Sequence, residues 1–92
     1  MKETNKNVID YTNEEFQKLV AESDTDILEN SLIPFLEKYY QGICIHKDAV
    51  IEGVKRGTIT KDAGVSATSD LYSILFKIED RILYIREQLK ER

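Results

Sequence analysis

The feature that most constrains the fold is a regular apolar pattern near the end of the chain. Between residues 69 and 92, apolar side chains recur at alternating spacings of four and three residues, at Leu71, Leu75, Ile78, Ile82, Ile85 and Leu89. Such a heptad pattern repeats every 3.5 residues and keeps its members on one side of an α-helix. It predicts one long amphipathic helix over residues 69–92, with these six side chains as its seam.

The same helix carries a second apolar stripe, about 120° around the helix axis from the seam, at Tyr72, Phe76 and Leu83. The seam is expected to pack on the chain's own earlier helices or, alternatively, on a partner helix or a second copy. A terminal helix with one neighbour should not need two apolar faces, so one face can close the core while the other meets a partner. A central position in a bundle would explain both faces without any partner.

The start of the first helix has the clearest local signal. Thr12 can accept a hydrogen bond from a free backbone N–H, and Glu15 can reach back to the N–H of Thr12, which is the capping-box pattern. Tyr11 and Phe16 occupy the two positions of a hydrophobic staple. We expect a short helix from Asn13 to about residue 22, burying Phe16, Leu19 and Val20.

A second apolar stripe at helical spacing follows, and it runs past a proline. Asp24 or Thr25 can cap this helix, whose expected inward residues are Leu28, Leu32, Phe35, Leu36, Tyr39 and Ile43. A proline within a helix removes one backbone hydrogen bond and clashes with the preceding turn. We expect either a kink at Pro34 or two short helices that meet at residues 31–34, with Pro34 facing outward.

Residues 48–56 indicate another short helix, since Lys55 and Arg56 suit the negative end of a helix dipole and Gly57 suits the left-handed position after it. Whether this helix continues the preceding one is left open. Residues 58–68 are rich in small and β-branched side chains and predict a long connection, after which Thr68 or Ser69 would cap the last helix.

Composition limits the classes of partner. The net charge of −4 disfavours binding to nucleic acid or anionic lipid, because phosphate binding needs a local surplus of Lys and Arg. No apolar run approaches the roughly 20 residues that cross a bilayer. The first seven residues have no apolar core of a signal peptide. The expectation is a cytoplasmic protein with a flexible segment over residues 1–10 and one helical domain over residues 11–92.

No catalytic, cofactor-binding or metal-binding motif is present. Cys44 and His46 stand two residues apart, which points them away from each other on a helix. One Cys and one His do not complete a structural zinc site. The many carboxylates are explained as helix caps and solvated faces. The chain is therefore expected not to be an enzyme and to need no cofactor.

The segment Ala63-Gly64-Val65-Ser66 resembles the turn of helix-turn-helix DNA-binding regulators, and the following Leu71-Tyr72 and Phe76-Lys77 resemble the recognition-helix region of tetracycline-repressor-like regulators. The resemblance covers about fifteen residues, and residues 57–62 are too short for the support helix. It implies, as the alternative function, a small transcriptional regulator with a degenerate helix-turn-helix around residues 55–77, whose DNA-binding cations would be Lys55, Arg56 and Lys61.

The sequence as a whole predicts an all-α fold, a small bundle of three to five helices with a long C-terminal amphipathic helix. The leading functional hypothesis is a non-enzymatic protein–protein interaction module, such as an adaptor, an inhibitor or an immunity-type factor, acting through the C-terminal helix and as a homodimer in one version. Its expected partner-binding residues are Tyr72, Phe76 and Leu83, together with the exposed aromatic Tyr40.

Overall fold

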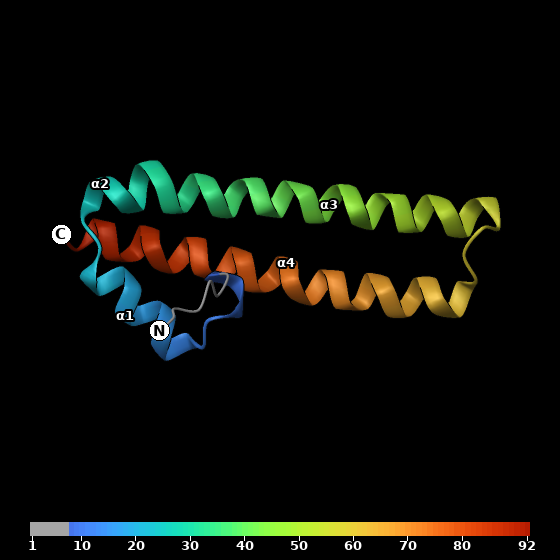
Figure 1. Ribbon diagram of the computed structural model, residues 1–92, viewed down its shortest axis with the longest axis horizontal. Helices are drawn as coiled ribbons and strands as arrows, with labels where there is room; N and C mark the ends of the chain where they lie inside the picture. Colours follow the sequence, from blue (N-terminus) through green and yellow to red (C-terminus); the bar gives the residue numbers. More distant parts are fainter. Residues whose placement is uncertain (1–7) are drawn as a thin grey trace, which may run out of the picture.

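Two long antiparallel helices form the body of the protein in the computed structural model, which describes residues 8–92. They are α3 (Ile33–Arg56) and α4 (Lys61–Lys90), and a tight turn joins them. The shorter elements η1 (Val8–Asp10), α1 (Asn13–Glu22), α2 (Thr25–Ile27) and η2 (Leu28–Leu32) precede them. In Figure 1, α1 packs beside α4 at the end where the chain terminates, and the α3–α4 turn lies at the far end. The prediction of an all-α fold is confirmed for the described residues.

The capping box at the start of α1 is confirmed. The backbone N–H of Thr12 donates to Glu15 Oε1 at 2.8 Å, and the N–H of Glu15 donates to Thr12 Oγ1 at 3.1 Å. At the other end of α1, the guanidinium of Arg92 donates to the carbonyls of Val20 and Ser23, both at 2.9 Å. Local sequence thus starts α1, while Arg92 adds hydrogen bonds to carbonyls at its C-terminal end, where Val20 also accepts from the N–H of Ser23.

The chain passes Pro34 without a break, because a π-helical turn precedes it. The N–H of Ile33 bonds the carbonyl of Leu28, five residues back, so η2 joins α2 directly to α3. The wider turn makes room in the backbone ladder just before the residue that has no N–H. Pro34 faces outward as expected. The alternative of two separate helices meeting at residues 31–34 is wrong.

The π turn also corrects one expected core residue. It holds one residue more than an α-helical turn, so the inward positions run from Leu28 to Ile33 and Leu36. Phe35, expected to face inward from the uninterrupted 3.6-residue pattern, is instead exposed. The extra residue of the π turn shifts the inward positions of the following helix by one residue. An uninterrupted 3.6-residue pattern does not include this shift and therefore placed Phe35 in the core.

α3 continues without interruption to Arg56, so residues 48–56 are its last turns and not a separate helix. Gly57 adopts the left-handed conformation, with φ of 81°, that ends α3. The expected long connection over residues 58–68 is wrong. Thr60 caps α4 by accepting from the N–H of Ala63 at 3.2 Å, so α4 begins eight residues before Ser69.

Small residues at the start of α4 serve close packing, not a loop. A Cβ atom on Gly64 would collide with Cγ2 of Val54 on α3. Thr68, expected as a cap, instead lies within α4 and donates its hydroxyl to the carbonyl of Gly64 at 2.9 Å. The two long helices therefore approach each other closely near the turn, where α4 carries small side chains.

The heptad seam packs inside the chain. Leu71, Leu75, Ile78 and Ile85 are buried, and Ile82 and Leu89 are partly buried against the core. Most of the core lies at the end of the hairpin that α1 covers, and it comprises Ile9, Phe16, Val20, Leu28, Ile33, Leu36, Ile78 and Ile85. The prediction that the seam packs on the chain's own helices is thus confirmed.

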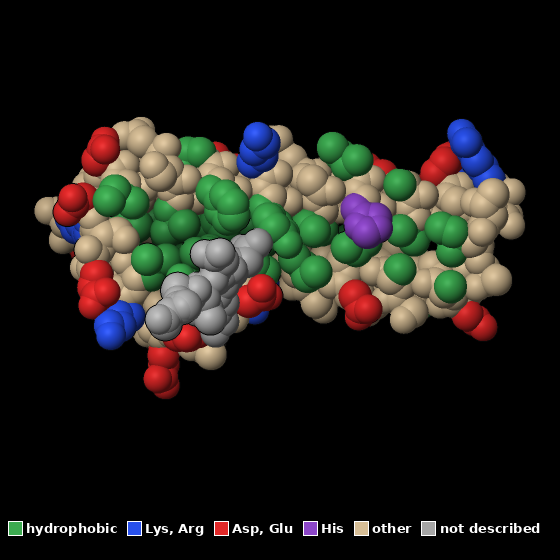
Figure 2. Space-filling model, viewed as in Figure 1, with side chains coloured by type: hydrophobic (Ala, Val, Ile, Leu, Met, Phe, Trp, Pro, Cys, Tyr) green, Lys and Arg blue, Asp and Glu red, His purple; other side chains and the backbone are tan. Residues whose placement is uncertain are grey.

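α1 covers only part of the hairpin. At 1.5 Å per residue, its 10 residues span about 15 Å, while the 30 residues of α4 span about 45 Å. Figure 2 shows the face that carries α1, with hydrophobic side chains gathered in the trough between the two long helices. The half of the hairpin nearest the turn is a two-helix layer.

Of the segment expected to be flexible, residues 1–7 lie outside the described residues. Val8–Asp10 form a 3-10 turn, and Ile9 is buried in the core. Arg81 of α4 holds this segment, since its guanidinium donates to the carbonyls of Val8 at 2.8 Å and Tyr11 at 2.7 Å. No helix within residues 8–92 is both long and apolar enough to cross a membrane.

Candidate functional site

Four large apolar side chains are exposed along one side of α4, and we call them the α4 stripe. They are Val65, Tyr72, Phe76 and Leu83, with exposed fractions of 61, 42, 62 and 59%. Tyr72, Phe76 and Leu83 each follow a seam residue by one position, and Val65 stands seven residues before Tyr72, so all four share one side of the helix. Phe76 lies about 140° around α4 from Arg81, the residue that faces α1. The stripe therefore belongs to the side of the hairpin opposite α1, here termed the open face.

Aromatic rings occupy the middle of the stripe. The rings of Tyr72 and Phe76 stack with centroids 6.4 Å apart and an interplanar angle of 27°. From α3, the ammonium group of Lys47 lies 5.4 Å from the centroid of the Tyr72 ring. The electrostatic interaction with Tyr72 is the main cause that raises the pKa of Lys47; burial opposes it, and the neighbouring Asp48 carboxylate adds to the rise. These contacts set a cation beside a rigid, flat apolar surface.

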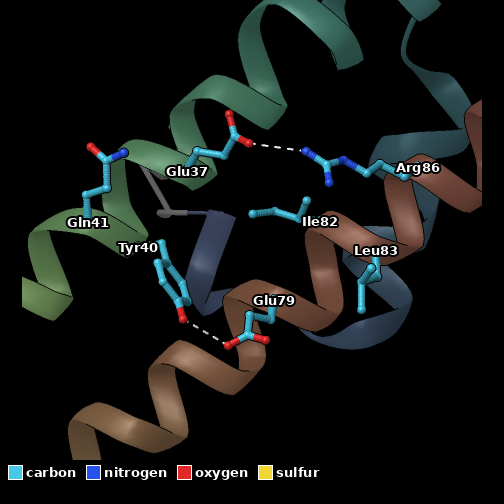
Figure 3. A pocket seen from close by; sticks show the side chains of 7 residues that line it. All are labelled: Glu37, Tyr40, Gln41, Glu79, Ile82, Leu83 and Arg86. Atoms are coloured by element: carbon cyan, nitrogen blue, oxygen red, sulfur yellow. Dashed lines mark hydrogen bonds and ion pairs between the residues drawn. The ribbon is translucent and has the colours of Figure 1, made fainter.

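A hollow of about 460 Å³ lies between α3 and α4 beside one end of the stripe. It is lined by Glu37, Tyr40, Gln41, Glu79, Ile82, Leu83 and Arg86. Figure 3 shows Tyr40 reaching from α3 to α4, where its hydroxyl donates to Glu79 Oε1 at 3.0 Å. This hydrogen bond raises the pKa of the Tyr40 phenol. An ion pair of 3.2 Å between Arg86 and Glu37 closes the other side of the hollow.

A second hollow, of about 240 Å³, lies beside the other end of the stripe, near the turn. Ile51, Val54, Lys55, Lys61, Gly64, Val65 and Thr68 line it. The stripe thus runs from one hollow to the other, with Leu83 lining the first and Val65 the second. Apolar knobs beside shallow hollows are the ordinary geometry of helix packing surfaces.

The structure brings together all four residues proposed from the sequence for partner binding. Tyr72, Phe76 and Leu83 are exposed on one side of α4, and Tyr40 is half-buried in the hollow that Leu83 also lines. Sequence reasoning missed Val65, although it stands seven residues before Tyr72 and so continues the heptad spacing. It was assigned to a connection because its neighbours Ala63, Gly64 and Ser66 are small.

A smaller apolar patch lies at the α1 end of the hairpin. Ile27 and Phe35 are exposed there beside a pit of about 230 Å³, whose lining includes Leu19 and Leu32. This patch was not predicted from the sequence, because Phe35 was expected to lie in the core. The α4 stripe is longer and carries twice as many exposed large apolar side chains.

The expected helix-turn-helix is not formed. Residues 63–66 lie within the first turns of α4, so the turn that the resemblance implied is wrong. Lys55, Arg56 and Lys61 do lie close together around the α3–α4 turn, and Arg56 pairs with Glu52 at 3.9 Å. DNA binding through these cations stays a prediction of the sequence alone.

The two reactive side chains considered in the sequence, Cys44 and His46, both lie on α3. Cys44 is half-buried and His46 is exposed, both within the same helix. Within residues 8–92 there is no group of three or more His, Cys, Asp or Glu side chains that could hold a metal ion. The open face therefore offers shape, apolar area and a few charges.

The chain matches no family model, no curated protein and no solved structure.

Proposed function

We propose that this protein is a non-enzymatic docking module that binds another protein through the α4 stripe and its flanking hollows. The observation that carries the proposal is the exposure of Val65, Tyr72, Phe76 and Leu83 on one side of a helix whose seam is already satisfied within the chain. A row of exposed apolar side chains on one side of a helix, rimmed by polar groups, is typical of interaction sites in soluble proteins.

Burial of these side chains supplies a driving force for binding. Removing one such side chain from water is worth roughly 1.5–3 kcal/mol. Association and side-chain ordering oppose this gain, so the sum over four residues overstates the affinity. The aromatic pair Tyr72–Phe76 at the centre of the stripe suits the role of an anchor, since binding energy concentrates in central aromatic residues.

Rigidity of the surface supports the same function. The stripe lies on a single helix, α4, which is held against α3 along its seam. A partner therefore meets side chains whose backbone is already ordered, which lowers the entropy cost of binding. An adaptor, an inhibitor or an immunity-type factor would act in this way, by covering a surface of its partner.

The test is a pull-down from the native host with three tagged forms of the chain: wild type, Phe76→Glu and Ile45→Glu. Ile45 is a matched control, because it is a lone apolar residue on α3 with 71% exposure and lies outside the stripe. A protein retained by wild type and by Ile45→Glu, and lost with Phe76→Glu, supports the proposal. Retention of every captured protein by Phe76→Glu would refute it.

A further inference from the structure

We propose that the partner seated on the open face is a second copy of this chain, packed antiparallel to the first about a two-fold axis at Ile74 of α4. This inference rests on the proposed docking function and names its partner. Two hairpins joined in this way form a four-helix bundle. Three properties of the open face point to this occupant: its spacing, its charges and its area.

The spacing of the stripe is symmetric about Ile74. An antiparallel copy places Val65 opposite Leu83 of the second copy and Tyr72 opposite its Phe76. A two-fold interface requires a surface that is complementary to itself, with each contact made twice. Apolar residues here meet apolar residues at all four positions, and the aromatic pair lies at the axis.

The polar residues of the same face follow the same symmetry. Ser69 and Glu79 lie on the same side of α4, between the apolar residues of the stripe. The axis at Ile74 places Ser69 of one copy opposite Glu79 of the other. The Ser69 hydroxyl of each copy can then donate to the Glu79 carboxylate of the other. The Glu79 carboxylate, which accepts from Tyr40 within its own chain, thus gains a second donor where the interface removes it from water.

Charge favours the antiparallel arrangement over one with both turns at the same end. The hollow near the turn carries Lys55 and Lys61, while the hollow at the other end carries Glu37 and Glu79, together with Arg86. An antiparallel copy brings the lysine-bearing end of each face over the glutamate-bearing end of the other. The opposite arrangement brings the lysines of both copies together, and like charges suppress such a register.

The area is sufficient for a stable dimer. With the axis at Ile74, residues 61–87 of the two α4 helices overlap over about 40 Å. Two helices side by side present a width of roughly 20 Å, so each copy covers about 800 Å². The total of about 1,600 Å² is the usual size of a specific interface. α1 does not obstruct this contact, because it packs on the other side of α4.

The register can be tested by cysteine cross-linking in chains that carry Cys44→Ser, which removes the one native thiol. One chain carries Val65→Cys and the other Leu83→Cys, both at exposed positions that folding tolerates. Residues 65 and 83 of opposite copies face each other across the interface, whereas the two copies of residue 65 lie roughly 27 Å from each other along the helix axis. A short bismaleimide should therefore link the mixture and leave each chain alone unlinked.

The outcomes separate this inference from the proposed function. Cross-linking of the mixed chains, abolished by adding Phe76→Glu to both, supports the antiparallel dimer. Cross-linked dimers in a sample that contains only one of the two cysteine variants, or no cross-linked dimer in the mixture, would overturn it. If the pull-down then still returns a different protein that depends on Phe76, the docking function stands and the second copy is not its partner. If the pull-down returns no protein that depends on Phe76, the docking function and the antiparallel dimer are both refuted.

Discussion

Arg81 is the residue through which α4 holds the start of the chain. Its side chain is 4% exposed, and its guanidinium lies 4.7 Å from the centre of the Phe16 ring. It donates to two backbone carbonyls of the segment before α1, those of Val8 and Tyr11. Burial lowers the pKa of Arg81 from its ordinary value.

Removing this side chain should destabilise the fold. We expect Arg81→Ala to lower the free energy of unfolding by about 3 kcal/mol, because charged hydrogen bonds and ring packing are lost together. Arg86→Ala is the control, since it breaks only the exposed ion pair with Glu37 and should cost less than about 1 kcal/mol. Urea unfolding followed by circular dichroism measures both. Equal effects of the two substitutions would contradict the role assigned to Arg81.

At the scale of single helices, features that depend on residues close in sequence were predicted correctly. Features that depend on contacts between helices were not. The capping box of Thr12 and Glu15 and the seam of α4 depend on residues close in sequence, and both are present in the structure. The start of α4 was missed, because Gly64 and its small neighbours favour a loop in isolation. Only the approach of Val54 from α3 explains why a glycine is needed there.

The π turn before Pro34 was missed for a related reason. A backbone turn with one extra residue leaves no mark in composition, and the uninterrupted pattern therefore placed Phe35 in the core. The stripe of Tyr72, Phe76 and Leu83 was predictable, because it needs nothing beyond the geometry of one helix. Its neighbours across the groove, Lys47 and Glu37, come from α3 and could not be placed until the pairing of the two helices was known.

Two glycines within the long helices should respond to alanine with opposite signs. At Gly42 of α3 no atom lies within 4 Å of the added Cβ, so Gly42→Ala should stabilise the protein by about 0.5–1 kcal/mol through helix propensity. At Gly64 the added methyl group meets Val54, and Gly64→Ala should cost about 1–3 kcal/mol. Urea unfolding at a fixed protein concentration compares them. Stabilisation by both would show that α3 and α4 do not approach closely at the turn.

Across the whole molecule, the hairpin is much longer than the part that α1 covers. The extents of 50 × 34 × 18 Å describe a narrow, thin body in which two helices alone form the end near the turn. A pair of helices buries one side of each partner and leaves the other sides in water. The exposed stripe follows from this arrangement, and a second hairpin laid on the open face would complete the layer that is missing there.

The molecular mass in solution tests this central claim most directly. In sedimentation equilibrium, the apparent mass of the wild-type protein should rise with concentration from 10.7 kDa toward twice that value. Phe76→Glu should weaken association by at least about 100-fold, because it sets a charge in the apolar centre of the interface. Ile45→Glu should match wild type. A wild-type mass that stays at 10.7 kDa up to about 1 mM, or an equal response of both variants, would contradict the account.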